Sequence, residues 1–154
     1  MKKIFILILF ISADLIIKRF IYENIELNSF IRILSFFEIT HIHNYGISFG
    51  LLSGTISKEV IIIISLLITL IIFYLFIISS NRIEKWGLLF IIAGAISNII
   101  DRSLNNYVLD FIYLHYNDFY WPAFNFADIY ITIGVLLILY NVLIDIKKLR
   151  YDKN

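Results

Sequence analysis

A long apolar stretch constrains this chain more than any other feature. From Val60 to Ile78 every side chain is apolar or aromatic apart from Ser65 and Thr69. A helix of that length, rising about 1.5 Å per residue, nearly crosses the ~30 Å hydrocarbon layer of a bilayer. Serine and threonine can bond to carbonyls of their own helix, so neither interrupts it. The stretch therefore predicts a membrane-spanning helix.

The composition favours lipid as the solvent for the whole chain. Hydrophobic residues make up 60% of the 154 residues and charged residues 16%, against about 45–50% and about 25% in ordinary soluble domains. A soluble protein of this size has too little interior to bury so many apolar side chains. We therefore expect residues 1–154 to form a single integral membrane domain. The net charge of +1 gives no field that would attract nucleic acid, and the absence of cysteine excludes thiolate chemistry.

Three further segments are apolar, and each carries polar interruptions within it or at its end. The first follows two lysines and resembles a secretory signal peptide, but no convincing cleavage site precedes its aspartate and more apolar segments follow. We therefore expect a retained helix. The predicted fold is an all-α membrane protein with four transmembrane helices, over residues 4–22, 58–79, 84–103 and 123–146.

Basic residues flank these segments on one side only, which predicts their orientation. Cytoplasmic loops of membrane proteins are enriched in lysine and arginine. Both termini and the short middle loop are therefore expected in the cytoplasm, with the longer loops 23–57 and 104–122 on the outer side of a cytoplasmic (inner) membrane. The residues behind this prediction are Lys2, Lys3, Arg82, Lys85, Lys147, Lys148, Arg150 and Lys153.

The first outer loop has the pattern of a small β-hairpin. Residues Phe36–His43 mix β-branched and aromatic side chains, Asn44–Gly46 is typical of a turn, and Ile47–Leu52 is apolar again. We expect this hairpin to lie against the membrane surface.

Polar and ionisable residues gather at one level of the predicted bundle. Placing such groups in a bilayer costs a few kcal/mol or more, so each one calls for an explanation. With the orientation above, the inner halves of the helices are almost purely apolar, Asn141 being the exception. The pattern predicts a polar site at the outer interface, not a pore. Its members are Asp14, Lys18, Asn44, Asn98, Asp101, Arg102, Asp110, Asn125 and Asp128.

Several of these residues also have purely structural interpretations. Asp14 and Lys18 are four residues apart with the acid first, the favourable order for a helical ion pair. Asp101 and Arg102 suit an interfacial anchor in which the arginine extends to the headgroups. Asp128 begins an apolar span and could cap its helix. For the remaining polar loop residues we expect solvated positions and no metal site; they are Glu38, His41, His43, His115 and Asp118.

Five short blocks carry most of the polar and small residues of interest, namely Asp14 to Lys18, Asn44 to Phe49, Gly94 to Arg102, Val108 to Phe111 and Phe124 to Asp128. In this order and at these intervals they resemble the lipoprotein signal peptidase (signal peptidase II) family over nearly the whole chain. Two departures from the family pattern occur: Ile17 replaces the usual threonine, and Ala93 and Ser97 stand where glycine is typical and would let helices approach closely.

The resemblance implies an aspartic endopeptidase whose catalytic pair is Asp110 and Asp128. It implies that the enzyme removes signal peptides from prolipoproteins by cutting before a diacylglyceryl-modified cysteine. The expected partners are this peptide and membrane lipids; we expect a monomer, with no metal and no other cofactor. The family's other polar or small positions would support the site or contact substrate, and here they are Asp14, Lys18, Asn44, Gly46, Asn98, Asp101, Arg102, Asn125 and Ala127.

Two close carboxylates suit acid–base chemistry because they cannot both ionise readily and so share a proton. The ionised member can activate water while the protonated member polarises the scissile carbonyl. A proton- or ion-coupled transporter is the alternative, since membrane carboxylates often relay protons. It predicts polar residues through the full depth of the bundle. A structural scaffold is a third possibility, and it predicts that Asp110 and Asp128 tolerate asparagine.

Overall fold

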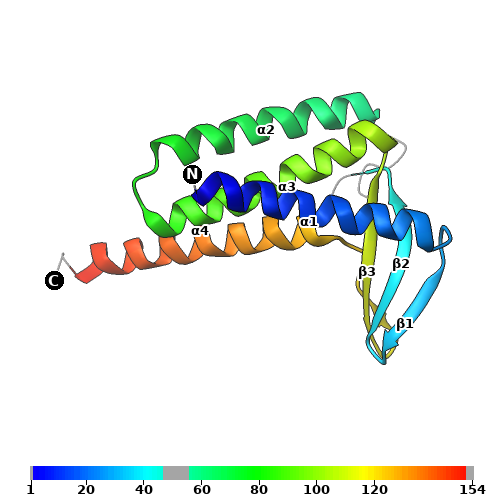
Figure 1. The fold of residues 1–154 in the computed structure, drawn as a ribbon. Coiled ribbons are helices and arrows are strands. Elements are labelled where there is room, and N and C mark those ends of the chain that lie inside the picture. Colours follow the sequence, from blue (N-terminus) through cyan, green and yellow to red (C-terminus); the bar gives the residue numbers. More distant parts are fainter. Residues whose placement is uncertain (1, 47–55, 152–154) are drawn as a thin grey trace.

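A bundle of helices carries a small sheet at one end, as the computed structural model shows for residues 2–46 and 56–151 (Figure 1). The helices lie where the apolar segments predict them. In chain order the elements are α1 (Lys2–Asn24), β1 (Phe30–Leu34), β2 (Phe37–Asn44), α2 (Lys58–Ile78), α3 (Arg82–Asn105), β3 (Val108–Tyr116), β4 (Phe119–Tyr120) and α4 (Phe126–Tyr151).

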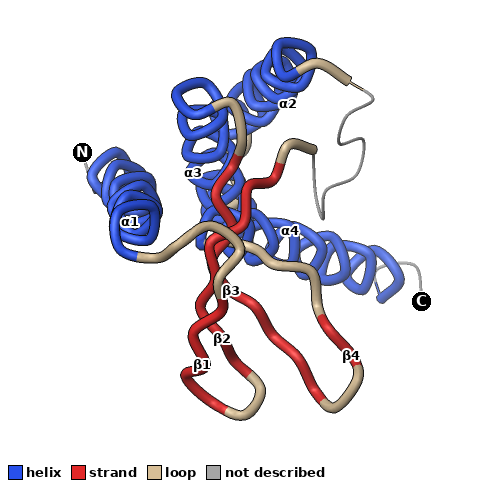
Figure 2. The backbone as a smooth tube through the Cα atoms, turned by 90° about the vertical axis from the view of Figure 1, so that its right-hand side faces the viewer, coloured by secondary structure: helices blue, strands red, loops and turns tan. Residues whose placement is uncertain are grey.

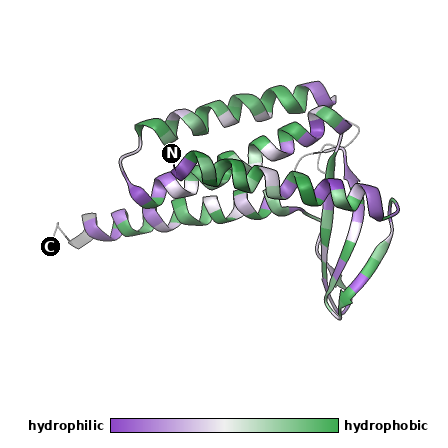
Figure 3. Ribbon diagram, viewed as in Figure 1, coloured by the Kyte–Doolittle hydropathy of each residue, from purple (hydrophilic) through white to green (hydrophobic). Residues whose placement is uncertain are grey.

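Among the described residues, three helices are long and apolar enough to cross a membrane: α2, α3, and α4 over Phe126–Lys148. Hydrophobic residues predominate along α2 and recur along α3 and α4 (Figure 3). Only 6% of the most apolar window of α2 is buried within the protein, so most of that helix needs another apolar environment. The chain is thus a multi-pass membrane protein. Helix α1 has 23 residues but a more charged sequence, and its role as a fourth span stays a prediction.

Helix α3 is the centre of the bundle, since α1, α2 and α4 all pack against it. Two glycine contacts bring α3 and α4 together. A Cβ on Gly94 would lie 2.2 Å from the carbonyl oxygen of Ala127, and one on Gly134 would lie 2.5 Å from that of Gly87. Such distances require hydrogen in place of a side chain, because real Cβ atoms do not approach a carbonyl so closely. The backbones of α3 and α4 are therefore in direct contact beside the start of α4.

The sheet is antiparallel with the order β1-β2-β3-β4, and its strands come from the two longer loops, one between α1 and α2 and the other between α3 and α4 (Figure 2). Strand β2 pairs with β3 so that Asn44 lies opposite Val108 and Ile42 opposite Asp110. Beyond β4, Phe124 exchanges backbone hydrogen bonds with Ile112. These pairings bring the end of β2 and the segment before α4 to the same part of β3.

The sheet corrects one prediction and adds strands to the second loop. The hairpin in the first loop is formed by β1 and β2, with its turn at residues 35–36, and so precedes the predicted turn at Asn44–Gly46. The apolar run 47–52 lies outside the described residues. The second loop, for which no strand was predicted, contains β3 and β4. Its strand residues alternate branched and aromatic side chains, but they form a strand because β2, from the other loop, supplies the partner.

Candidate active site

Asp110 lies near the start of β3 and is almost fully buried. Both of its carboxylate oxygens accept hydrogen bonds from side-chain amides. Asn44 Nδ2 donates to Oδ2 at 2.9 Å and Asn125 Nδ2 donates to Oδ1 at 2.7 Å. Each donor depends on the sheet, because β2 places Asn44 and the pairing of residue 124 with β3 places Asn125. The strand that sequence analysis missed therefore builds half of the site.

Asp128 lies in the first turn of α4, where the helix dipole favours a negative charge. Its Oδ2 accepts from the backbone N–H of Asn125 at 3.2 Å, and its own N–H donates to Asn125 Oδ1 at 3.0 Å. This reciprocal exchange is a capping box, with aspartate in place of the usual glutamate. The other oxygen, Oδ1, accepts from Asn98 Nδ2 at 3.0 Å. Asp128 thus caps its helix, as predicted, and still has contacts to other elements.

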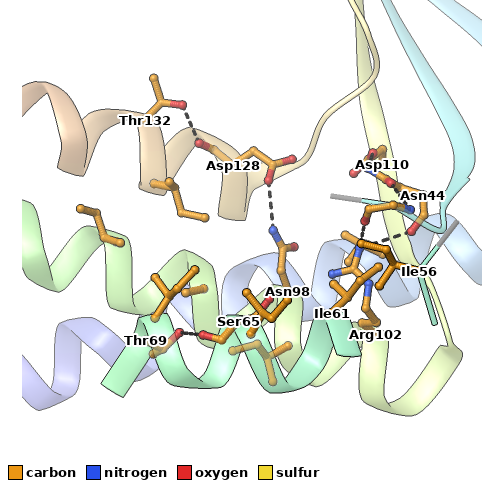
Figure 4. A pocket seen from close by; sticks show the side chains of 18 of the residues that line it. Asn44, Ile56, Ile61, Ser65, Thr69, Asn98, Arg102, Asp110, Asp128 and Thr132 are labelled. Carbon is orange, nitrogen blue, oxygen red and sulfur yellow. Dashed lines mark hydrogen bonds between the residues drawn. The ribbon is translucent and has the colours of Figure 1, made fainter. Parts of the chain in front are cut away.

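Asp110 and Asp128 lie on the same cavity. Its volume is about 530 Å³, and both carboxylates line it together with Asn44, Asn98 and Arg102 (Figure 4). Asn125 links the two, since its side chain donates to Asp110 and its backbone donates to Asp128. Residues from four separate segments therefore converge, as the sequence predicted for this level of the bundle.

Burial and mutual repulsion change the protonation of this site. Burial, and after it the charge of Asp128, together raise the pKa of Asp110 to about 7, against the opposing hydrogen bonds from Asn44 and Asn125. A carboxyl group with that pKa is partly protonated near neutral pH, whereas an ordinary aspartate is ionised. The arrangement can therefore offer an acid and a base together.

A second group of charges lies behind the cavity. Lys18 Nζ is 2.8 Å from Asp14 Oδ2 and 3.3 Å from Asp101 Oδ2, and it donates to Asn98 Oδ1 at 2.8 Å. The predicted ion pair between Asp14 and Lys18 is confirmed. Ser97, which sequence analysis treated only as a replaced glycine, donates to Asp14 Oδ2 at 2.6 Å. The signal that was overlooked is a hydroxyl next to Asn98 in an otherwise apolar run.

Arg102 does not extend to the membrane surface, so its interpretation as an interfacial anchor is wrong. Only 6% of the residue is exposed. Its Nη2 donates to the carbonyl oxygens of Gly46 and Asn44, so it holds the end of β2 against α3. Ala127 is fully buried where α4 meets Gly94. All the predicted site residues except the charges behind the cavity thus lie on it or brace its wall.

The loop histidines differ from their predicted solvated positions. His41 is buried, and its Nδ1 lies 2.7 Å from the carbonyl oxygen of Ile25, while its Nε2 is 3.0 Å from Nε2 of His43. His115 and Glu38 are mostly buried and 3.4 Å apart. Among the described residues no group of three potential ligands could hold a metal ion. All four side chains belong to strands β2 and β3 of the sheet.

Asn141, the exception to the apolar pattern in the sequence, lies at the end of the bundle where α3 begins. Asn141 Oδ1 accepts from Asn81 Nδ2 at 2.7 Å. Asn81 caps α3, since its side chain accepts from the backbone N–H groups of Ile83 and Glu84. Asn141 therefore has a structural role at a helix end, far in the bundle from the carboxylate pair.

Helices long and apolar enough to cross a membrane, together with two buried carboxyl groups on one cavity, define a class: membrane proteins with an internal acidic site. Comparison with known proteins identifies the family within this class, because a model of the signal peptidase (SPase) II family matches residues 6–144. The chain belongs to the signal peptidase II family and is therefore a peptidase. This assignment gives no support to the transporter alternative.

Individual relatives agree over most of the chain. A lipoprotein signal peptidase of Wigglesworthia glossinidia brevipalpis is 37% identical over 91% of this chain and 93% of its own. One from Francisella tularensis subsp. novicida is 36% identical over 89% of each. A solved structure described as a bacterial membrane enzyme has a TM-score of 0.87 at 31% identity, covering 96% of this chain and 90% of that one. The similarity therefore extends to the whole fold.

Proposed function

We propose that this protein is an aspartic endopeptidase that removes signal peptides from diacylglyceryl-modified prolipoproteins, cutting before the lipid-bearing cysteine. Asp110 and Asp128 are its catalytic pair. One observation carries the proposal: the two carboxylates line one cavity at the end of the bundle, and Asn125 bonds to both. The family assignment supports the substrate class.

The chemistry follows from the shared proton. The ionised carboxylate removes a proton from water, and the resulting hydroxide adds to the scissile carbonyl carbon. The protonated carboxyl donates to the carbonyl oxygen, which then bears less negative charge. As the C–N bond breaks, a proton passes to the leaving amine and the pair returns to its starting state. Burial strengthens these interactions because the surroundings screen charge poorly.

The shape of the cavity suits an apolar substrate. Away from the carboxylates, the lining of the cavity comes from α2, α3 and α4 and is mainly aliphatic. Helix α2 packs against α3 but not extensively against α4. A hydrophobic peptide or acyl chain placed there would bury apolar surface at about 0.8 kcal/mol per CH₂. The aliphatic and small residues of this part are Ile61, Ile64, Ile68, Ile91, Ala95, Ile99 and Ile131.

The proposed topology makes α1 the fourth span of a single domain, with both termini in the cytoplasm and the site at the outer face of the inner membrane. Asp14 and Lys18, the charges in the middle of α1, are buried against other helices and paired. They would therefore not face lipid, which removes the main objection to a transmembrane α1. Labelling of single cysteines introduced at Asn24 and Asp118 should occur only from the outer side of intact cells.

The substrate class can be tested with purified protein in lipid vesicles. We expect it to release the signal peptide from a diacylglyceryl-modified precursor. The same precursor with an unmodified cysteine should be cut at least about 100-fold more slowly, because remote binding energy is lost from the transition state. Separation of product and precursor by gel electrophoresis gives both rates. Equal cleavage of the two precursors would contradict the proposed role of the lipid.

The pH dependence follows from the raised pKa of Asp110. A carboxyl group is protonated below its pKa, so the proton shared by the pair is retained below about 7 and lost above it. We therefore expect kcat to fall as pH rises through about 7, approaching about tenfold per pH unit well above it. Rates measured from pH 5 to 9 on one vesicle preparation would show this limb. A rate that stays constant up to pH 9 would contradict the shared proton.

A further inference from the structure

Two carboxylates outside the cavity hold the backbone next to the proposed catalytic residues. Asp101 Oδ2 accepts from the N–H of Leu109 at 2.9 Å, and Asp14 Oδ1 accepts from the N–H of Ala127 at 3.0 Å. Leu109 immediately precedes Asp110, and Ala127 immediately precedes Asp128. Each bond thus fixes the backbone nitrogen of the residue that precedes one member of the pair.

Lys18 connects these two carboxylates. Its ammonium group is within 3.3 Å of both, and the exposed fractions of Asp14, Lys18 and Asp101 are 0%, 3% and 3%. Burying an ion pair costs desolvation energy, so a buried group of three charges is weak evidence for stability alone. The geometry of the three charges suggests a positioning role instead. The Lys18 ammonium group holds Asp14 of α1 and Asp101 of α3 together, and each of these carboxylates binds a backbone N–H next to a member of the pair.

The same three residues do not contact the space where substrate would lie. Among the described residues that line the cavity, none is Asp14, Lys18 or Asp101, whereas Asn98, Asp110 and Asp128 are all present. Contact with the substrate is therefore not what places them there. Their connection to the cavity runs through Asn98 and through the backbone of Leu109 and Ala127.

We propose that Asp14, Lys18 and Asp101 form one ionic bracket that sets the position of both catalytic carboxylates relative to each other. The inference rests on the proposed function of Asp110 and Asp128. These two residues come from a strand and from a helix, and the bracket is a direct link between the elements that hold them. A displacement of about 1 Å in a catalytic group can cost about 100-fold in rate.

Charge-conserving variants separate position from electrostatics. Asp101→Glu and Asp14→Glu keep the negative charge but move the acceptor oxygens by one methylene group. We expect each to lower kcat, per folded enzyme, by about 10- to 100-fold with KM within about twofold. The fall of kcat at high pH should also begin at a lower pH, since carboxylates that lie farther apart raise each other's pKa less.

A matched control is Asn81→Ala at the opposite end of α3. It removes side-chain bonds to the helix backbone, as the glutamate variants do, but it lies outside the site. We expect a lower unfolding temperature with kcat, KM and the pH limb unchanged. If the glutamate variants do not fold, Asp101→Asn and Asp14→Asn keep the side-chain shape and lose one contact each, because an amide nitrogen cannot accept a bond from a donor.

Three results would overturn the bracket. A raised KM with normal kcat would mean substrate contact; normal kcat and an unmoved pH limb would mean a purely structural role. The double variant Asp14→Glu/Asp101→Glu should be about as slow as the slower single variant, because residues that act as a unit are not additive; a product of the single effects would mean two independent anchors.

Asp110→Asn and Asp128→Asn, measured in the same assay, separate this inference from the proposed function. Activity in either variant would refute the catalytic pair itself. If both are inactive while the glutamate variants match the wild type, the catalytic pair stands and the bracket alone is refuted.

Discussion

Replacement of Asp128 or Asp110 by asparagine is expected to stop peptide cleavage, with each rate reduced by at least about 100-fold and up to about 10⁴-fold. An amide of the same shape can neither take a proton from water nor deliver one to the leaving amine. Each side chain accepts its present hydrogen bonds from side-chain amides or a backbone N–H. The new NH₂ group therefore loses one of these bonds, while the other bond and the side-chain shape are kept. The loss should therefore appear in kcat.

The measurement is release of signal peptide from a lipid-modified precursor in vesicles, with insertion checked by protease protection. Asp118→Asn is the matched control, since it makes the same chemical change at an exposed carboxylate beside the same sheet. We expect it to cleave at the wild-type rate. Wild-type activity in either site variant, with normal insertion, would refute the pair and favour the scaffold interpretation.

Substitution of valine for Gly94 is expected to have the second largest effect. The first added carbon would lie 2.2 Å from the carbonyl oxygen of Ala127 and the isoleucine at 131 is 2.8 Å away on the same side, so α3 and α4 must separate. Overpacking of this kind commonly costs about 1–3 kcal/mol; here a backbone atom blocks the new side chain, so we expect the upper end or more. Because Asp128 immediately follows Ala127 in the chain, we expect the cleavage rate to fall together with the stability.

Thermal unfolding in detergent and the cleavage rate per folded enzyme measure the two parts of this effect. Ser103→Val is the control, because it adds comparable bulk to an exposed position of the same helix. It should leave both quantities near their wild-type values. An unchanged unfolding temperature for Gly94→Val would mean that the contact between α3 and α4 is less tight than the structure indicates.

The helices and the level of the site could be predicted from sequence because both depend on local information. Apolar length sets each span, and the cost of burying charge makes every intramembrane carboxylate conspicuous. The sheet could not be predicted in the same way. Strand β3 forms because β2, far away in sequence, offers its edge, and no local pattern states that pairing.

The same limit applies to the contacts within the site. The sequence predicted the ion pair of Asp14 and Lys18 from their spacing on one helix. It could not predict that Asp101 would accept from Leu109, because that bond depends on how the chain turns between α3 and β3. Nor could it show that Arg102 would turn inward, since its partners are carbonyl groups of another loop.

Three asparagine side chains decide where an acid proton can point. The oxygen of each is already taken: Asn44 Oδ1 by the N–H of Gly46, Asn98 Oδ1 by Lys18, and Asn125 Oδ1 by the N–H of Asp128. Their NH₂ groups are therefore obliged to face the carboxylates.

An NH₂ group cannot accept a hydrogen bond from an O–H group. A carboxylic acid O–H in this site therefore has no acceptor among those three NH₂ groups. It must turn toward the other aspartate or into the open cavity. The surrounding amides present only donors to the carboxyl groups. They therefore direct the acid proton toward the part of the cavity where a peptide carbonyl would bind.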